Sequence, residues 1–148
     1  MSLPTTDVVI GVHRLAGGAV PVYATAGAAA CDVYANEAGI VPARGIKLFR
    51  TGLVMVIPDG FECQVRPRSG LAVKHGITVI NSPGTIDSDY RGELGIALHN
   101  TSTVDFEVNI GDRIAQLVFA PAVRVRFEDV DIIPPTCRGS GGYSSTGR

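Results

Sequence analysis

Two carboxylates and an aromatic ring fall within the stretch Asn81–Glu93, where Asp87 and Asp89 are followed by Tyr90. A carboxylate can act as a general base on water, and an aromatic ring can pack on a ligand. A decorated surface hairpin explains these residues equally well. An EF-hand calcium loop is excluded, because Arg91 stands where that loop needs an oxygen ligand.

Anion-binding chemistry is concentrated in Pro67–Ala72, which reads PRSGLA. The pattern predicts a short helix over residues 69–76, capped by Ser69 and ended by a glycine. Arg68 and Ser69 would then lie at a helix start, where free N–H groups attract anions. A capped helix with a surface arginine is the simpler interpretation of these residues alone.

Two more polar residues stand among apolar or small neighbours. Gln116 lies within the apolar run of Gly111–Phe119, and a buried glutamine needs a partner, which can be structural, a ligand or water. Asp32 follows a run of small residues, and a carboxylate there could order a hydrated magnesium ion. A solvated aspartate at a strand end is the simpler alternative.

The chain ends in RGSGGYSSTGR, residues 138–148, where glycine and serine surround Arg138 and a single ring, Tyr143. Such a segment cannot bury a core that repays the entropy of ordering it. Its residues instead suit phosphate oxygens and a flat ring, so we expect a flexible glycine-rich lid.

The elements that must position these residues are mainly strands. Glycine (18) and proline (9) cut the chain into short apolar pieces, and only residues 69–76 favour a helix. Many short strands with regular turns favour a sandwich, jelly roll or small barrel. The expected strands are 8–12, 53–57, 61–65, 77–80, 94–98, 104–108 and 123–127, and Asn81–Glu93 is expected to be a hairpin loop.

Composition limits the classes of protein. The 148 residues suit one domain, which we place at residues 1–137, before the tail. A net charge of -1 argues against a nucleic-acid partner, and the apolar runs are too short to span a membrane. Cys31, Cys63 and Cys137 show no paired spacing, which favours a reducing compartment. Because no secretory signal is visible, we expect a cytoplasmic protein.

The order of the motifs is more specific than any one of them. PRSGLA, IDSDYRGE, GDRIAQL and the glycine-rich tail follow the Asp32 segment, and together they closely resemble the five motifs of the homotrimeric dUTPases. The family usually has Phe-Gly where Tyr143-Ser144 stands. The resemblance implies a jelly-roll-like (β-clip) all-β subunit with one short helix, a threefold homotrimer, and hydrolysis of dUTP to dUMP and pyrophosphate with Mg2+.

The resemblance also implies roles for individual residues. Asp32 would hold waters around the magnesium, Asp87 would orient the attacking water, and Gln116 would lie near that water and the phosphates. The remaining substrate-binding residues fall into three groups. The phosphates would meet Arg68, Ser69 and Gly70; uracil and deoxyribose would meet Asn81, Gly84, Thr85, Ile86 and Tyr90; the lid, reaching a neighbouring subunit's site, would supply Arg138, Gly142, Tyr143, Ser145 and Thr146.

Three other interpretations fit parts of the sequence. A dCTP deaminase, or a bifunctional deaminase and dUTPase, belongs to the same superfamily, although no zinc-deaminase signature is present. A nucleotide-sensing regulator would keep the fold but lose catalytic residues, yet Asp87 and Arg138 are both present. A plain β-sandwich interaction module would leave the order of the motifs as coincidence.

Overall fold

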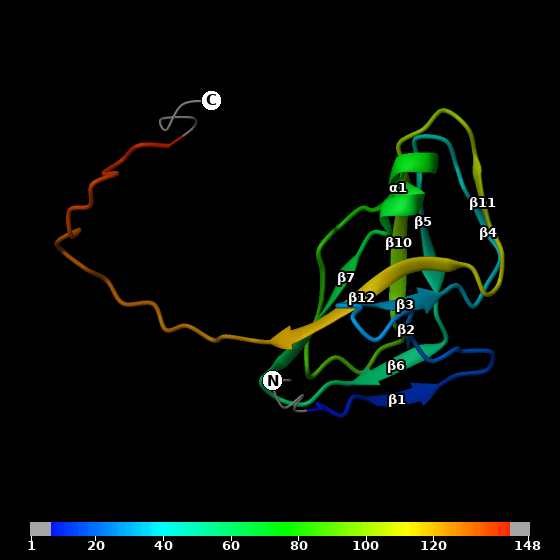
Figure 1. Cartoon of the computed structure of the whole chain (residues 1–148), viewed down its shortest axis with the longest axis horizontal. Helices are drawn as coiled ribbons and strands as arrows, with labels where there is room; N and C mark the ends of the chain where they lie inside the picture. Colours follow the sequence, from blue (N-terminus) through cyan, green and yellow to red (C-terminus); the bar gives the residue numbers. More distant parts are fainter. Residues whose placement is uncertain (1–6, 143–148) are drawn as a thin grey trace.

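A computed structural model describes residues 7–142, as a β-rich body followed by an extended C-terminal segment (Figure 1). Within these residues, no helix has the length and apolar character needed to cross a membrane. The elements are β1 Gly11–Arg14, β2 Val22–Tyr23, β3 Cys31–Tyr34, β4 Gly39–Val41, β5 Ile46–Arg50, β6 Leu53–Val56, β7 Phe61–Arg66, α1 Ser69–His75, β8 Ile77–Val79, β9 Gly84–Ile86, β10 Gly95–Asn100, β11 Phe106–Val108 and β12 Arg113–Pro121.

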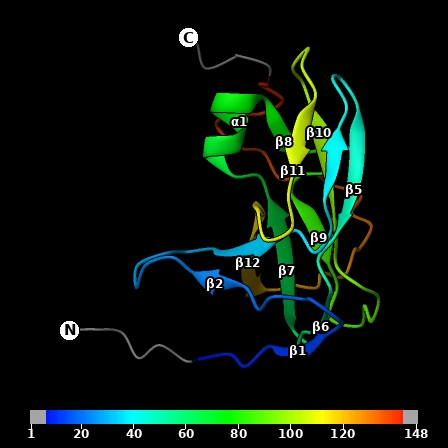
Figure 2. The same ribbon diagram turned by 90° about the vertical axis from the view of Figure 1, so that its right-hand side faces the viewer.

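The largest sheet has five strands in the order β2-β3-β12-β7-β9, and a second sheet has the order β5-β10-β8. The strands β1-β6 and β4-β11 form two smaller ribbons. Every pairing is antiparallel. Strand β12 is distant in sequence from both of its neighbours, β3 and β7, and it lies beside β7 in Figure 2. The fold thus brings the Asp32 and Gln116 segments side by side.

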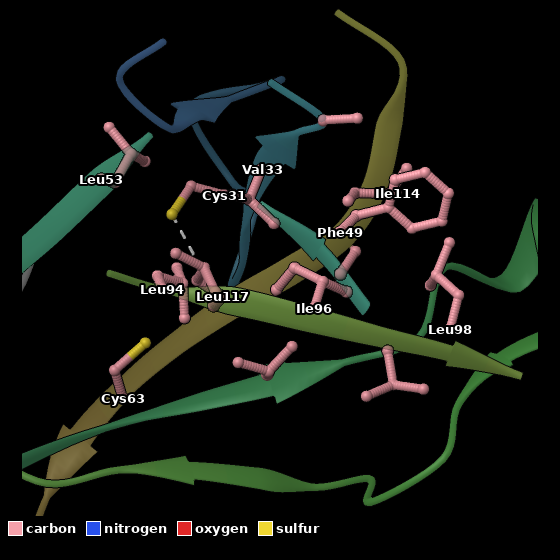
Figure 3. Packing of buried hydrophobic residues seen from close by; sticks show 14 of the residues in the cluster. Cys31, Val33, Phe49, Leu53, Cys63, Leu94, Ile96, Leu98, Ile114 and Leu117 are labelled. Atoms are coloured by element: carbon pink, nitrogen blue, oxygen red, sulfur yellow. Dashed lines mark hydrogen bonds between the residues drawn. The ribbon is translucent and has the colours of Figure 1, made fainter. Parts of the chain in front are cut away.

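The core lies between these sheets, where side chains from alternate strand positions meet. Val33 and Leu117 of the five-stranded sheet pack with Phe49 and Ile96 of the three-stranded sheet (Figure 3). None of the four side chains is exposed to solvent. This core makes the large sheet a firm base for the polar residues on its outer face.

Helix α1 forms where the sequence predicts it and ends as predicted at Gly76, whose φ of 67° is left-handed. The expected serine cap is wrong. Arg68 occupies the cap position in an extended conformation, with no side-chain cap hydrogen bond. Ser69 is already helical, so its hydroxyl is not in the extended geometry from which a cap bonds the first turn.

The predicted strands at 53–57, 61–65, 77–80 and 94–98 are confirmed as β6, β7, β8 and β10, with ends shifted by one or two residues. Strand β1 begins later than expected, and β11 covers only the second half of residues 104–108. The hairpin loop Asn81–Glu93 is also more structured than expected. Its residues Gly84–Ile86 form β9 and pair with β7 in the other sheet.

The expected strand at 123–127 is wrong for this chain. Within residues 7–142 no strand pairs with it, and Val123, Val125 and Phe127 are 85%, 67% and 92% exposed. We call residues 122–142 the arm, which leaves the body after β12 (Figure 1). The segment does alternate apolar residues and arginines, but an alternating segment becomes a strand only where another strand offers hydrogen bonds.

Candidate active site

Three polar residues form a row across the outer face of the five-stranded sheet. Asp32 pairs with Gln116, and Gln116 pairs in turn with Arg66. Directly paired residues share a face of the sheet, and their neighbours Cys31 and Leu117 point into the core. The row therefore lies at the end of β7, where the PRSGLA stretch begins.

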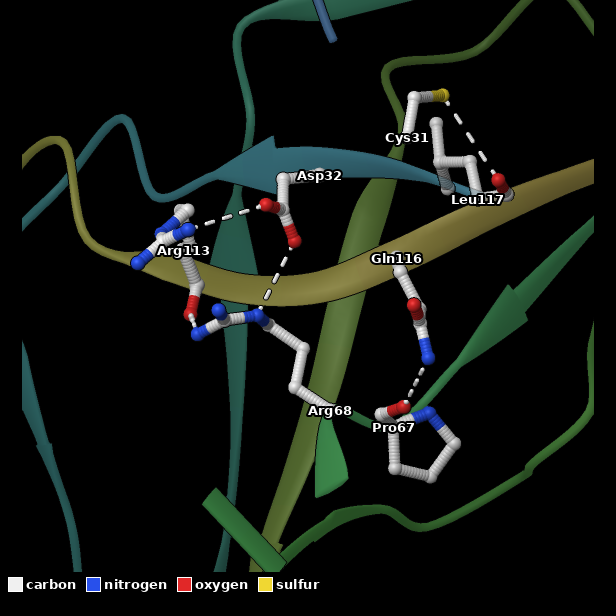
Figure 4. Close-up of polar contacts among 7 residues, drawn as sticks. All are labelled: Cys31, Asp32, Pro67, Arg68, Arg113, Gln116 and Leu117. Atoms are coloured by element: carbon white, nitrogen blue, oxygen red, sulfur yellow. Dashed lines mark hydrogen bonds and ion pairs between the residues drawn. The ribbon is translucent and has the colours of Figure 1, made fainter. Parts of the chain in front are cut away.

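Asp32 joins two arginines at one end of this row (Figure 4). Its Oδ1 accepts from Nε of Arg68 at 3.1 Å, and its Oδ2 accepts from Nη1 of Arg113 at 3.3 Å. The Arg68 guanidinium also donates through Nη1 to the carbonyl of Arg113 at 3.1 Å. Two cations around one carboxylate leave a net positive charge, which favours an anionic ligand.

Gln116 has the structural partner that its position requires. Its Nε2 donates to the carbonyl of Pro67 at 2.9 Å, which fixes the turn into α1. Beyond that turn Ser69 and Gly70 are exposed, and a Cβ added to Gly70 would meet no atom within 4 Å. The first turn of α1 is thus open beside the two arginines.

The second group of predicted site residues surrounds β9. Asp87 lies with Thr85, Ser88 and Asp89 in a hollow of about 430 Å³ that also borders the start of β7. Gly84 is buried, and a Cβ there would press on Asn81 Nδ2 at 3.1 Å and on Val65. The lack of a side chain at Gly84 thus lets β9 lie close to Val65 of β7 and to Asn81 without displacing them.

The loop after β9 is fixed by contacts with its own backbone. The Tyr90 hydroxyl donates to the carbonyl of Glu93 at 3.1 Å. The Arg91 guanidinium donates to the carbonyls of Ser88 and Tyr90 at 2.6 and 2.9 Å. Tyr90 remains 44% exposed, so its ring is available to a ligand.

The two groups do not meet within one chain. Ile86, next to Asp87, pairs with Cys63, whereas Gln116 pairs with Arg66, three residues further along β7. Three residues correspond to roughly 10 Å at about 3.3 Å per residue. Asp87 and Arg68 accordingly line different hollows. The structure brings Asp32, Arg68 and Gln116 together, and it holds Asp87 and Tyr90 apart from them.

The C-terminal residues form a third group on the arm. Arg138 Nε donates to the carbonyl of Gly141 at 2.7 Å, and Gly141 donates back to the carbonyl of Arg138 at 3.1 Å. This turn brings the chain to Gly142. Tyr143, Ser145 and Thr146 lie outside the described residues.

The donor set is consistent with a magnesium ion that is held mostly by other ligands. Among residues 7–142 no group of three or more His, Cys, Asp or Glu side chains could hold a metal ion. Mg2+ usually keeps several waters and is bound by one or two carboxylates together with substrate phosphates. Asp32, beside two cations that attract phosphate, fits that arrangement.

Sequence reasoning missed Arg66 and Arg113. Arg66 stands one residue before PRSGLA, and Arg113 is the third residue of GDRIAQL. The signal for Arg66 was the alternation of β7, which places it on the face opposite Val65. The string alone does not show that Arg113 faces Asp32.

Comparison with known proteins gives one consistent result. A family model described as dUTPase matches residues 17–147. The deoxyuridine 5'-triphosphate nucleotidohydrolase of Roseobacter denitrificans is 53% identical over 131 residues, which cover 86% of each chain. The enzyme of the same name from Rickettsia conorii is 52% identical over 132 residues, covering 88% of this chain and 89% of its own.

Solved structures show the same fold at low sequence identity. The Staphylococcus bacteriophage 80alpha dUTPase, solved with dUpNHpp, has a TM-score of 0.88 at 22% identity, covering 96% of this chain and all of its own. A phage phi11 dUTPase from S. aureus, described with a structural Mg(II) ion, has a TM-score of 0.78 at 21% identity, covering 84% and 98%.

Proposed function

The chain belongs to the dUTPase family as a deoxyuridine 5'-triphosphate nucleotidohydrolase, and we propose that it hydrolyses dUTP at sites completed by neighbouring subunits. The products are dUMP and pyrophosphate. The reaction limits uracil in DNA and supplies dUMP for thymidylate synthesis. The observation that carries the shared site is the separation of Asp87 from Arg68 within one chain.

In the proposed reaction, water attacks the α-phosphorus of dUTP. Asp87, at the end of β9, accepts a proton from that water, a role typically worth about 10²–10⁴-fold in rate. Phosphoryl transfer otherwise asks mainly for alignment and charge stabilisation. Bound Mg2+ would neutralise charge on the phosphates, with Asp32 holding its waters.

The phosphates are proposed to bind at the open first turn of α1. Arg68 supplies charge-assisted hydrogen bonds, and Ser69 and Gly70 offer their exposed surface. Gln116 holds the turn through the Pro67 carbonyl and lies beside this site. Its place in the row next to Asp32 supports a role near the attacking water.

Base and sugar are proposed to bind along the Asn81–Tyr90 segment. A backbone that offers one donor and one acceptor separates uracil from cytosine, because an unmatched polar edge leaves buried groups unpaired. The tight turn at Gly84 leaves little room for the thymine methyl group. The ring of Tyr90 packs where a ribose 2'-hydroxyl would otherwise lie.

A homotrimer is proposed as the working form, and exposed apolar surface supports association. On the outer face of the second sheet, Ile46, Leu48 and Ile80 are 55%, 59% and 46% exposed. The arm carries further exposed apolar side chains that association would bury. We propose that it also brings Arg138 and the residues after it to a neighbour's site as a lid. Closed symmetric assemblies are the usual solution for such surfaces.

The direct test is pyrophosphate release from dUTP, dCTP, dTTP and UTP, with ammonia measured on dCTP. We expect release from dUTP only and no ammonia. Ammonia from dCTP would instead identify a deaminase, and a chain that binds dUTP without turnover would be a sensor. We place this reaction in the cytoplasm, in keeping with the free thiols Cys31, Cys63 and Cys137.

A further inference from the structure

We propose that Arg113 is a positioning residue that keeps Asp32 in place when Arg68 transfers from Asp32 to the substrate phosphates. The inference rests on the proposed function. It concerns the charge balance among Asp32, Arg68 and Arg113 before and after substrate binds.

A bulge in the sheet places Arg113 beside Asp32. The register between β12 and β3 shifts between Arg113 and Ala115, so that Ile114 is the extra residue. Ile114 and Ala115 are both buried, which breaks the alternation of the strand. Without the extra residue, Arg113 would point to the core, three positions from Gln116. Bulges of this kind re-aim side chains and are frequent beside active sites.

The three side chains divide the contacts between them (Figure 4). Each carboxylate oxygen of Asp32 takes a different arginine, and the Asp32 side chain is only 15% exposed. Arg68, 24% exposed, is held from two sides, by Asp32 and by the Arg113 carbonyl. Arg113 is 51% exposed and is the outer member of the cluster.

Arg68 gives its Nε to Asp32 and an Nη1 hydrogen to the Arg113 carbonyl, so a two-pronged contact with a phosphate that uses Nε requires it to leave Asp32. When its guanidinium turns to a phosphate, the Oδ1 of Asp32 loses its partner beside a highly charged anion. The Asp32 carboxylate then needs a second cationic partner, because the phosphates repel a carboxylate that has none. Arg113 supplies that partner through Oδ2, and it can do so before any metal ion is present.

This division predicts an effect on binding that is separate from turnover. Arg113→Ala should weaken binding of the non-hydrolysable analogue dUpNHpp about tenfold in EDTA. The loss should be smaller in excess Mg2+, because the charge of a bound ion would also balance that of Asp32. Arg113→Lys should restore part of the loss, since lysine keeps the charge but lacks the planar fork. Arg50→Ala is the matched control. Arg50, at the end of β5, is also an exposed arginine in an ion pair, with its Nε 3.4 Å from Oε2 of Glu93.

The decisive comparison adds Asp32→Asn and measures dUpNHpp binding by titration calorimetry in EDTA. If Arg113 acts through Asp32, Arg113→Ala should cost at most about twofold once Asp32 is neutral. A tenfold loss that persists in the Asp32→Asn background would overturn the proposal, because Arg113 would then contact the phosphates itself. An unchanged affinity for Arg113→Ala alone would overturn it too. A wild-type chain that releases no pyrophosphate from dUTP would instead contradict the proposed function.

Discussion

Within one chain, Asp87 lies beside the start of strand β7, and Arg68 lies two residues beyond the end of that strand. The strand between them is a fixed spacer, because it pairs with β12 on one side and with β9 on the other. If Asp87 is the base and Arg68 binds phosphate, as proposed, this spacing favours a site in which the two residues come from different chains.

Replacing Asp87 with asparagine should separate binding from turnover. The amide keeps the size of the side chain but cannot take a proton from water, so kcat should fall by about 10²–10⁴-fold. Binding of dUpNHpp should stay within about threefold. Asp89→Asn is the matched control, because Asp89 shares the hollow with Asp87. Near wild-type turnover in Asp87→Asn would remove Asp87 from its role.

Gly70→Ala should harm binding without harming the fold. A Cβ at this position meets no protein atom within 4 Å, and alanine favours a helix over glycine by about 1 kcal/mol. The melting temperature should be equal or higher, while a phosphate over the first turn would meet the new methyl group. We expect about tenfold weaker binding of dUpNHpp, equivalent to ~1.4 kcal/mol. Unchanged affinity would place the phosphates elsewhere.

Gly76→Ala provides the contrasting case for stability. Its left-handed φ of 67° costs a non-glycine residue about 1–2 kcal/mol, and a Cβ would also meet Thr101 Oγ1 at 2.7 Å. Gly60→Ala is the control, since Gly60 has a φ of 82° but open space around it. Urea denaturation should show the larger loss for Gly76→Ala. Equal losses would mean that backbone strain alone decides both.

Ending the chain before Arg138 should abolish most hydrolysis without dispersing the subunits. The truncation removes the proposed lid and leaves the exposed apolar residues of the arm. If the proposed lid excludes water and completes the site, kcat/KM for dUTP should fall by at least about 10²-fold, whereas binding of dUMP should change little. Pyrophosphate assay, calorimetry and light scattering measure the three quantities. Full activity in the truncated chain would exclude the lid.

Alkaline pH should destabilise the fold through a buried thiol. Burial raises the pKa of the Cys63 thiol from 9.0 to about 12, with the neighbouring Cys31 as the next cause. A raised pKa in the folded state favours the protonated thiol, so its contribution is complete below pH 9 and is lost as pH rises towards 12. The slope from this group approaches ~1.4 kcal/mol per pH unit.

Urea denaturation between pH 8 and 11 tests this slope. Cys63→Ala should lower stability at every pH but flatten the alkaline decline, whereas Cys137→Ala, at an exposed position, should leave the decline unchanged. Parallel curves for wild type and Cys63→Ala would show that other groups cause the alkaline loss.

The fold could be predicted from the sequence to the extent that local patterns decide it. Alternation located β7, and a basic last turn before a glycine located the end of α1. The segment 123–127 has the same alternation as β7, yet it is not a strand in this chain. The alternation gives an extended segment one apolar and one polar face. The segment joins a sheet only where a neighbouring strand supplies hydrogen-bond partners.

The ordered motifs propose Asp32, Arg68, Asp87 and Gln116 as site residues, and these roles stay predictions. How far apart these residues lie within one chain could not be read from the motifs. The separation of Asp87 from Arg68 depends on β9 pairing with β7, which the hairpin interpretation of Asn81–Glu93 did not anticipate. The orientation of Arg113 towards Asp32 depends on a bulge in β12. One extra residue in a strand cannot be recognised from the sequence before the register is known.

The most direct test of the shared site mixes two inactive variants. Asp87→Asn and Arg68→Ala chains are refolded together at equal amounts, and pyrophosphate release from dUTP is measured. If each site takes Asp87 from one subunit and Arg68 from another, about one quarter of the sites in random mixed assemblies have both wild-type residues, and about that fraction of activity should return. Activity no higher than that of the separate variants would contradict a site shared between subunits.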